Sequence, residues 1–215
     1  LRHTAVSVMC APGSARAPWT GDGLTLKQGA RAMTPGVLAI MTLLMAAPGT
    51  GQASGSVRTV DAVDLERYVG VWFEIARYPN SFQDKCAGDV TATYSRRSDG
   101  RIDVINRCRV ADDSVTEARG IARVVDSKTF AKLKVRFAPA WLSFLPFVWG
   151  DYWILGLADD YRWAVVGSPD RKYLWVLARK ADLSADDYAA AQAAASANGF
   201  DTGRLVKTNH TAASK

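Results

Sequence analysis

Alternating hydrophobic and polar residues dominate the chain between residues 70 and 180. In "KLKVRF", Leu133, Val135 and Phe137 share one face of an extended segment, and cationic residues occupy the other. Turn signals such as Asp99-Gly100 recur between the alternating segments. The pattern predicts eight strands, at residues 70–79, 89–95, 102–110, 120–126, 131–137, 151–158, 163–168 and 173–180.

The connections between these predicted strands are short, which indicates that each strand pairs with the next one along the chain. Closing such a meander removes its exposed edges, so we expect an all-β fold, an eight-stranded up-and-down antiparallel β-barrel. A C-terminal α-helix follows at 183–200, with Ser184 as its N-cap and Gly199 at its end. Residues 203–208 are a candidate short ninth strand, and the barrel domain is expected to span 54–215.

The segment before the barrel is typical of a targeting sequence. Lys27 and Arg31 precede an apolar run, Val37–Ala47, and small residues follow at 51–53. The run is much shorter than the roughly 20 residues that span a bilayer, and Gly, Pro and Ser on its flanks disfavour a buried helix. We expect residues 1–53 to be a leader with a cleavable signal peptide, and the protein to be periplasmic or secreted. No cysteine directly follows the apolar run, so a lipoprotein anchor is not supported.

Export to an oxidising compartment changes the interpretation of the cysteines. Cys86 and Cys108 then form a candidate disulfide, which closes a loop of about twenty residues. Such a bridge stabilises the folded state relative to the unfolded chain by on the order of 3 kcal/mol. The alternative is a reactive thiol, activated by a neighbouring Arg107 or Arg109.

Charge and histidine content exclude several functions. The net charge of +6 falls to +3 once residues 1–53 are set aside, and the excess is spread along the chain, unlike a nucleic-acid footprint. The two histidines, His3 and His210, lie near the chain ends. Histidine-based acid–base chemistry and histidine ligation of a metal or haem are therefore not expected in the barrel. We expect no cofactor, no metal and no enzymatic activity.

Eight strands enclose a space that side chains fill or that holds one small ligand. Counting strand directions from Trp72 places Arg179, at the end of the last strand, beside that indole at the closed end of the barrel. A guanidinium over an indole contributes about 0.5–2 kcal/mol. Gly70 then lets the entering backbone pass close beneath the barrel floor.

Three ordered motifs carry a family resemblance. "GVWFE" resembles the first lipocalin motif, "LADDYRWAVV" with Asp160 and Tyr161 is similar to the second, and Arg179 after "YLWVLA" is similar to the third. The match spans residues 61–208. The stretches "FEIARYPNSFQ", "TATYS" and "GSPDRKYLWVLAR" further resemble the bacterial lipocalin and apolipoprotein D branch. The resemblance implies a carrier of a small hydrophobic ligand, typically a fatty acid or lysophospholipid, in envelope maintenance under stress. Trp72, Arg179, Gly70, Asp160 and Tyr161 would be structural.

The predicted inward faces define a candidate ligand site. Its residues are Glu74, Ala76, Tyr78, Val104, Asn106, Leu133, Val135, Phe137, Trp153, Tyr173 and Trp175. Glu74 and Asn106 either recognise a ligand head group or have a structural role. In the structural role, Glu74 pairs with a basic or tyrosine neighbour, because an unpaired buried carboxylate is costly. Trp153, Trp163 and Trp175 either fill the barrel or contact ligand.

The apolar segment 138–151 is predicted at the open end. It carries Trp141, Phe144, Phe147 and Trp149 with no charge before Asp151. Four interpretations of this apolar cluster are open. It forms a lid over the barrel, touches a membrane transiently, makes a homodimer contact, or packs on its own barrel.

Two other classes of function stay open at this point. A lipocalin-fold enzyme or redox protein would use Cys86 and Cys108, and a protein-interaction module would use the 138–151 loop. Two titratable thiols would favour the first class, and concentration-dependent dimers without fatty-acid binding would favour the second.

Overall fold

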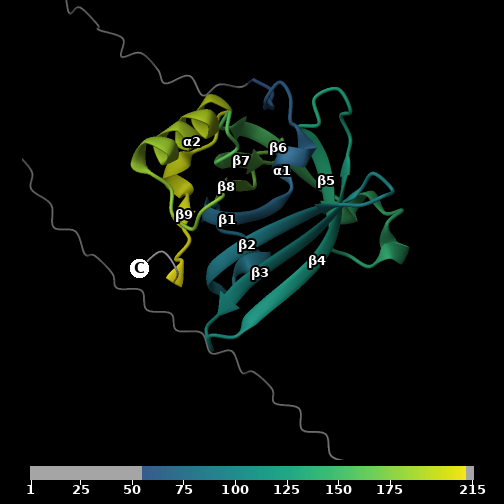
Figure 1. Cartoon of the computed structure of the whole chain (residues 1–215), viewed down its shortest axis with the longest axis horizontal. Coiled ribbons are helices and arrows are strands. Elements are labelled where there is room, and N and C mark those ends of the chain that lie inside the picture. The colour runs from purple at the N-terminus through teal and green to yellow at the C-terminus, as the bar shows by residue number, and fades with distance from the viewer. Residues whose placement is uncertain (1–54, 212–215) are drawn as a thin grey trace, which may run out of the picture. The chain divides into compact units, whose positions relative to one another are not determined.

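The computed structural model describes residues 55–211, so the predicted leader lies outside the described residues. Eight strands form the barrel: β1 (Gly70–Arg77), β2 (Cys86–Arg96), β3 (Ile102–Val110), β4 (Val115–Val124), β5 (Lys132–Arg136), β6 (Gly150–Leu157), β7 (Trp163–Gly167) and β8 (Leu174–Ala178). Each strand pairs antiparallel with the next, and β1 pairs with both β8 and β2 (Figure 1). The predicted closed up-and-down barrel is confirmed.

The wall between β1 and β2 is completed by the C-terminal residues. The two strands pair only from Gly70 to Phe73, because bulges in β2 turn it away beyond Thr91. The ninth strand, β9 (Val206–Lys207), pairs with the far half of β1. We call residues 206–211 the C-terminal strap. On the other side of the strap, the Asn209 carbonyl accepts from the backbone N–H of Asp89 on β2 at 2.8 Å. The strap therefore bridges the gap between β1 and β2.

A short helix, α1 (Leu65–Tyr68), closes one end of the barrel and was not predicted. Asp64 caps it by accepting from the backbone N–H of Glu66. The Asp64 N–H in turn donates to the Tyr161 hydroxyl at 2.8 Å. The helix has only four residues and needs this tertiary contact, so the local sequence pattern does not reveal it.

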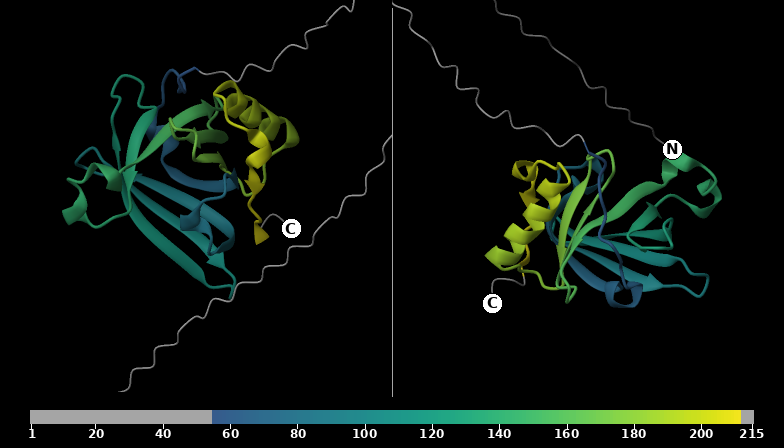
Figure 2. Two further views of the ribbon diagram at one scale, coloured as in Figure 1. Left: turned by 180° about the vertical axis from the view of Figure 1, so that it is seen from behind. Right: turned by 90° about the horizontal axis from the view of Figure 1, so that it is seen from above.

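The predicted C-terminal helix is α2 (Ala185–Ala197), and it packs on the outer wall of β6 and β7 (Figures 1 and 2). Ser184 caps it and Gly199 follows it with φ +76°, as expected. Alanines allow close approach: a Cβ added to Gly156 on β6 would lie 2.7 Å from the Ala194 Cβ.

The buried side chains divide into an inner cluster inside the barrel and an outer cluster beneath α2. The inner cluster contains Val63, Leu65, Tyr68, Trp72, Tyr94, Ile102, Val104, Ala122, Ala131, Leu133, Ile154, Tyr161, Ala164, Val166 and Leu177. The outer cluster contains Ile75, Ala76, Tyr78, Leu155, Trp163, Val165, Leu174, Val176, Ala191, Ala195 and Phe200, among others. Alternate residues of β7 and β8 therefore serve the two clusters.

The predicted inward orientation of Ala76 and Tyr78 is wrong. The pairing of β1 with β8 shifts between Glu74 and Ala76, which adds one residue to β1. Such a bulge reverses the faces of all residues beyond it. Ala76 and Tyr78 consequently belong to the outer cluster, and Arg77 takes the inward position opposite Trp175.

Two tryptophans expected inside the barrel also lie on its outer wall. Trp163 belongs to the outer cluster, because the neighbouring Ala164 takes the inward position on β7. Trp153 packs against the same outer cluster, with the Lys132 ammonium 4.5 Å from its ring centroid. Inside the barrel, Ala164 takes the place expected for Trp163, and Tyr152 and Ile154 take the place expected for Trp153.

Candidate functional site: the barrel interior and its rim

The barrel floor is sealed by Trp72 and Arg179. Trp72 is fully buried, and its Nε1–H donates to the Tyr68 carbonyl at 2.7 Å. The Arg179 guanidinium carbon lies 3.9 Å from the Trp72 ring centroid. Its N–H groups also donate to the carbonyls of Val71 at 2.9 Å and Arg67 at 2.6 Å. Arg179 thus ties the last strand to α1 and the first strand, as the motif pairing predicted.

Gly70 and Tyr161 occupy positions around this floor that require special backbone geometry. Gly70 has φ +98°, and an added Cβ would lie 3.4 Å from Arg179 Nη1. Only glycine adopts this conformation freely. Tyr161 has φ +64° in the turn between β6 and β7, and the Arg67 guanidinium lies 4.0 Å above its ring. Asp160 holds the same turn by accepting from the Arg162 backbone N–H.

The lower half of the barrel is packed with apolar side chains. The cavity left there measures about 10 Å³, which is room for one water-sized group. Its lining consists of Leu65, Tyr68, Val69, Tyr94, Ile102, Val104, Ala122, Leu133, Val135 and Tyr152. A longer ligand therefore reaches this depth only if some of these side chains change rotamer.

Towards the open end, β2, β3 and β4 present smaller inward residues. Asn106 on β3 lies between Ala92 and Ala118, and Ala118 is exposed although it alternates with the inward Ala122. The interior is therefore open to solvent at this level. At the rim, the Phe137 ring packs on Gly120, where an added Cβ would lie 2.8 Å from the ring.

Asn106 carries an acceptor without a protein partner. Its Oδ1 is buried and makes no hydrogen bond to any of residues 55–211. A buried unsatisfied amide oxygen is costly, so this position favours a ligand that brings a donor.

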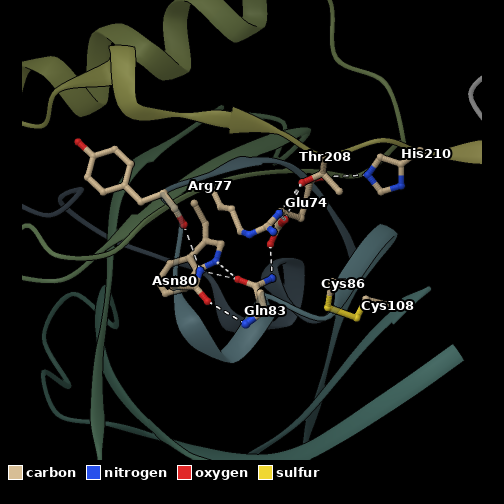
Figure 3. A network of polar contacts seen from close by, with 10 residues as sticks. Glu74, Arg77, Asn80, Gln83, Cys86, Cys108, Thr208 and His210 are labelled. Carbon is tan, nitrogen blue, oxygen red and sulfur yellow. Dashed lines mark hydrogen bonds and ion pairs between the residues drawn. A yellow bond between two sulfur atoms is a disulfide. The ribbon is translucent and has the colours of Figure 1, made fainter. Parts of the chain in front are cut away.

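Glu74 is buried and its carboxylate is fully engaged by protein donors (Figure 3). Oε1 accepts from Arg77 Nη1 at 2.9 Å and from the Thr208 hydroxyl at 2.6 Å. Oε2 accepts from the Gln83 side chain at 2.6 Å. Glu74 therefore joins β1 to the C-terminal strap, which is the structural role weighed against ligand recognition.

Gln83 extends this network to the barrel rim. Its Oε1 accepts from Trp175 Nε1 at 3.1 Å and from Asn80 Nδ2 at 2.8 Å. Tyr173 stacks on Trp175 with an interplanar angle of 15°, and the half-exposed Phe82 lies 5.4 Å from the Tyr173 ring. An aromatic cluster with a fixed polar base thus borders the mouth.

Three tyrosines inside the barrel form a chain of hydroxyl groups that the sequence analysis missed. The Tyr152 hydroxyl oxygen lies 2.8 Å from that of Tyr68 and 2.9 Å from that of Tyr94. We call these three residues the tyrosine triad. Burial raises the pKa of Tyr94 to about 12 and also raises the pKa values of Tyr68 and Tyr152, so all three phenols stay neutral.

The segment 138–149 between β5 and β6 forms an ordered loop that projects from the side of the barrel away from α2 (Figure 2). Its two short 3-10 turns carry exposed tips: Trp141, Phe144 and Phe147 are 73%, 76% and 80% exposed. Backbone bonds such as Leu142 N–H to the Pro139 carbonyl stay within the loop.

Trp149 holds the base of this loop. The Arg123 and Arg136 guanidinium carbons lie 4.4 and 5.3 Å from its ring centroid. Its Nε1–H donates to the Ser143 carbonyl at 2.8 Å. The loop is thus fixed in a shape that leaves its three aromatic tips uncovered, so it is not packed down on its own barrel.

Cys86 on β2 and Cys108 on β3 form the expected disulfide, with their Cα atoms 5.6 Å apart (Figure 3). The reactive-thiol alternative for this pair is therefore wrong. The bridge holds β2 and β3 together where bulges interrupt their pairing.

Comparison with known proteins identifies the family. The model of the "Lipocalin-like domain" matches residues 63–210, more than half of the chain. The chain belongs to the lipocalin family. The predicted resemblance to its bacterial and apolipoprotein D members is confirmed.

Relatives and solved structures agree with this assignment. The lipocalin is 39% identical to temperature-induced lipocalin-1 of Arabidopsis thaliana, over 71% of this chain and 82% of the relative. It is 38% identical to outer membrane lipoprotein Blc of Escherichia coli, over 70% of this chain and 81% of the relative. Insecticyanin of the tobacco hornworm Manduca sexta has the same fold, with a TM-score of 0.57 at 18% identity over 73% and 86%. Lipocalins are carriers of small hydrophobic ligands, and this chain belongs to that class of carrier protein.

No group of three or more His, Cys, Asp or Glu side chains within residues 55–211 is placed to hold a metal ion. No helix in this part of the chain is long and apolar enough to cross a membrane.

Proposed function

We propose that this lipocalin is an exported, non-enzymatic carrier of a fatty acid or lysophospholipid in envelope maintenance. The observation that supports it most is the closed barrel with an apolar inner cluster, sealed at the floor and open at the other end. An alkyl chain entering there contacts Val135, Leu133 and Val104 once side chains around the small lower cavity change rotamer, and its polar head group stays towards the open end near Asn106. The name of the bacterial relative, an outer membrane lipoprotein, supports a role in the envelope.

Direct identification of the cargo tests this proposal. The protein purified from its own host is extracted with organic solvent, and the extract is analysed by mass spectrometry. A fatty acid or lysophospholipid recovered in about equimolar amount supports the proposal, whereas an extract without any lipid, together with no binding of added fatty acid, contradicts it.

We further propose that the exposed loop touches the membrane while lipid is transferred. Several of its backbone N–H groups bond within the loop, residues 137–150 carry no charge, and three aromatic side chains are exposed. Aromatic side chains of this kind favour the head-group region of a bilayer. The loop lies beside the rim instead of being packed down, so a membrane contact is favoured over a lid.

Replacing Trp141, Phe144 and Phe147 together by serine is expected to slow the transfer of a fluorescent fatty acid from phospholipid vesicles about tenfold, the factor for about 1.4 kcal/mol of lost apolar burial. Affinity for the same probe in solution should stay unchanged, because the barrel lining is untouched. Phe130→Ser, at an exposed aromatic in the turn before β5, is the matched control and should leave transfer unaffected.

Unchanged transfer in the triple variant would contradict the membrane contact. Sedimentation of both proteins tests the homodimer alternative: a dimer that becomes a monomer on substitution would assign the loop to subunit contact.

A further inference from the structure

The tyrosine triad has one hydrogen-bond donor more than the protein uses. Three hydroxyl groups carry three hydrogens, and the two contacts of Tyr152 with Tyr68 and Tyr94 consume two of them, whichever way they point. No other group among residues 55–211 hydrogen-bonds to these hydroxyls. One phenolic hydrogen is therefore left over at a buried position, where unpaired donors are costly.

The surroundings of the triad are apolar. Its three rings line the small cavity together with side chains such as Leu65, Val104 and Leu133. Two charged groups of the barrel, Arg179 and Glu74, are engaged elsewhere. Arg179 lies over the Trp72 ring at the floor and donates to backbone carbonyls, and the Glu74 carboxylate is taken up by Arg77, Thr208 and Gln83.

We propose that the tyrosine triad is a subsite for a neutral oxygen acceptor, such as a ketone, ester or alcohol oxygen, at the leading end of a hydrophobic ligand. The inference rests on the proposed carrier function and adds a second ligand class and a binding direction. The ligand enters oxygen first, the unused phenolic hydrogen bonds to that oxygen, and the hydrocarbon part occupies the upper barrel.

The geometry favours a neutral oxygen over a carboxylate. A carboxylate at this depth would lose its hydration shell without gaining a cationic partner, and the free-energy cost of such desolvation is high. Three phenols with raised pKa values stay protonated and offer donors but no charge. A fatty-acid carboxylate therefore stays at the rim, whereas a neutral oxygenated lipid reaches the triad.

The test compares a long-chain methyl ketone with the alkane of the same chain length, by displacement of a bound fluorescent fatty acid. The wild-type protein should bind the ketone about tenfold more tightly, as expected for one additional buried hydrogen bond. The variant Tyr68→Phe/Tyr94→Phe/Tyr152→Phe keeps all three rings and removes every hydroxyl together. Because both partners of each hydrogen bond are removed, no buried hydroxyl loses its partner, and the variant is expected to fold.

In the triple variant, the ketone and the alkane should bind equally, with the affinity for the alkane unchanged. Tyr188→Phe is the control, because Tyr188 lies on α2 and its side chain packs against the outer cluster. A second readout needs no variant: the phenol absorption band of the wild type should shift on binding the ketone and not on binding the alkane.

A ketone preference that persists in the triple variant would overturn the subsite. The same holds for a wild type that binds fatty acid but shows neither a ketone preference nor a phenol shift, which leaves the carrier function intact. Failure to bind fatty acid, ketone and alkane alike would overturn the carrier function and this subsite with it.

Discussion

Replacing Trp72 by alanine is expected to lower the free energy of unfolding by about 4 kcal/mol, as for other fully buried tryptophans. The indole is completely buried, and its loss opens a cavity at the floor of the barrel. It also removes the donor to the Tyr68 carbonyl and the ring beneath the Arg179 guanidinium. Urea unfolding followed by far-UV circular dichroism measures the change.

The exposed Trp141 provides the matched control for this substitution. Trp141→Ala removes the same side chain from a position that is 73% exposed, and should change stability by less than about 0.5 kcal/mol. Equal losses for the two variants would show that the floor does not depend on the indole. An Arg179→Ala variant should lose stability more than it loses affinity for ligand, because the guanidinium lies outside the cavity lining.

Replacing Glu74 by alanine is expected to cost about 3 kcal/mol, because it breaks a buried ion pair and leaves its partner without a counter-charge. The Arg77 and Glu74 side chains are only 15% and 4% exposed. The Thr208 hydroxyl and the Gln83 amide lose their acceptor as well. The C-terminal strap should therefore loosen before the rest of the barrel.

Hydrogen exchange measures this loosening locally. The Thr208 backbone N–H donates to the Ile75 carbonyl, and its protection should fall more than that of amides in β7. Glu66→Ala is the control, since Glu66 pairs with Arg96 at the surface and surface pairs contribute roughly 0–1 kcal/mol. Uniform loss of protection across β1–β9 would contradict a specific tie between Glu74 and the strap.

The floor of the barrel follows from the sequence because its parts are local motifs linked by strand counting. Gly70, Trp72 and Arg179 lie at strand ends, so their meeting depends only on the number and direction of strands. Leu133 and Val135 were placed inward correctly, because β5 alternates without interruption. In β1 the same counting fails at Ala76, where one extra residue in the pairing with β8 reverses the face.

Other features depend on contacts between distant residues, which a single sequence does not display. Thr208 meets Glu74 across 134 positions, and the Tyr68 and Tyr152 hydroxyls meet across 84. Inward tyrosines resemble ordinary core residues until their hydroxyl groups converge. Small inward residues at Ala92 and Ala118 would have been a signal for the open upper barrel, but the strand predicted at 120–126 began too late to include Ala118.

The central claim is that ligand occupies the barrel above its sealed floor, and titration of a fluorescent fatty acid into single-residue variants tests it most directly. Phe137→Glu and Trp175→Glu, both at the rim, should each weaken binding at least about tenfold, because a charge would face the alkyl chain. Phe130→Glu, at an exposed aromatic in the turn before β5, should bind as the wild type does. Unchanged affinity in both rim variants would contradict binding inside the barrel.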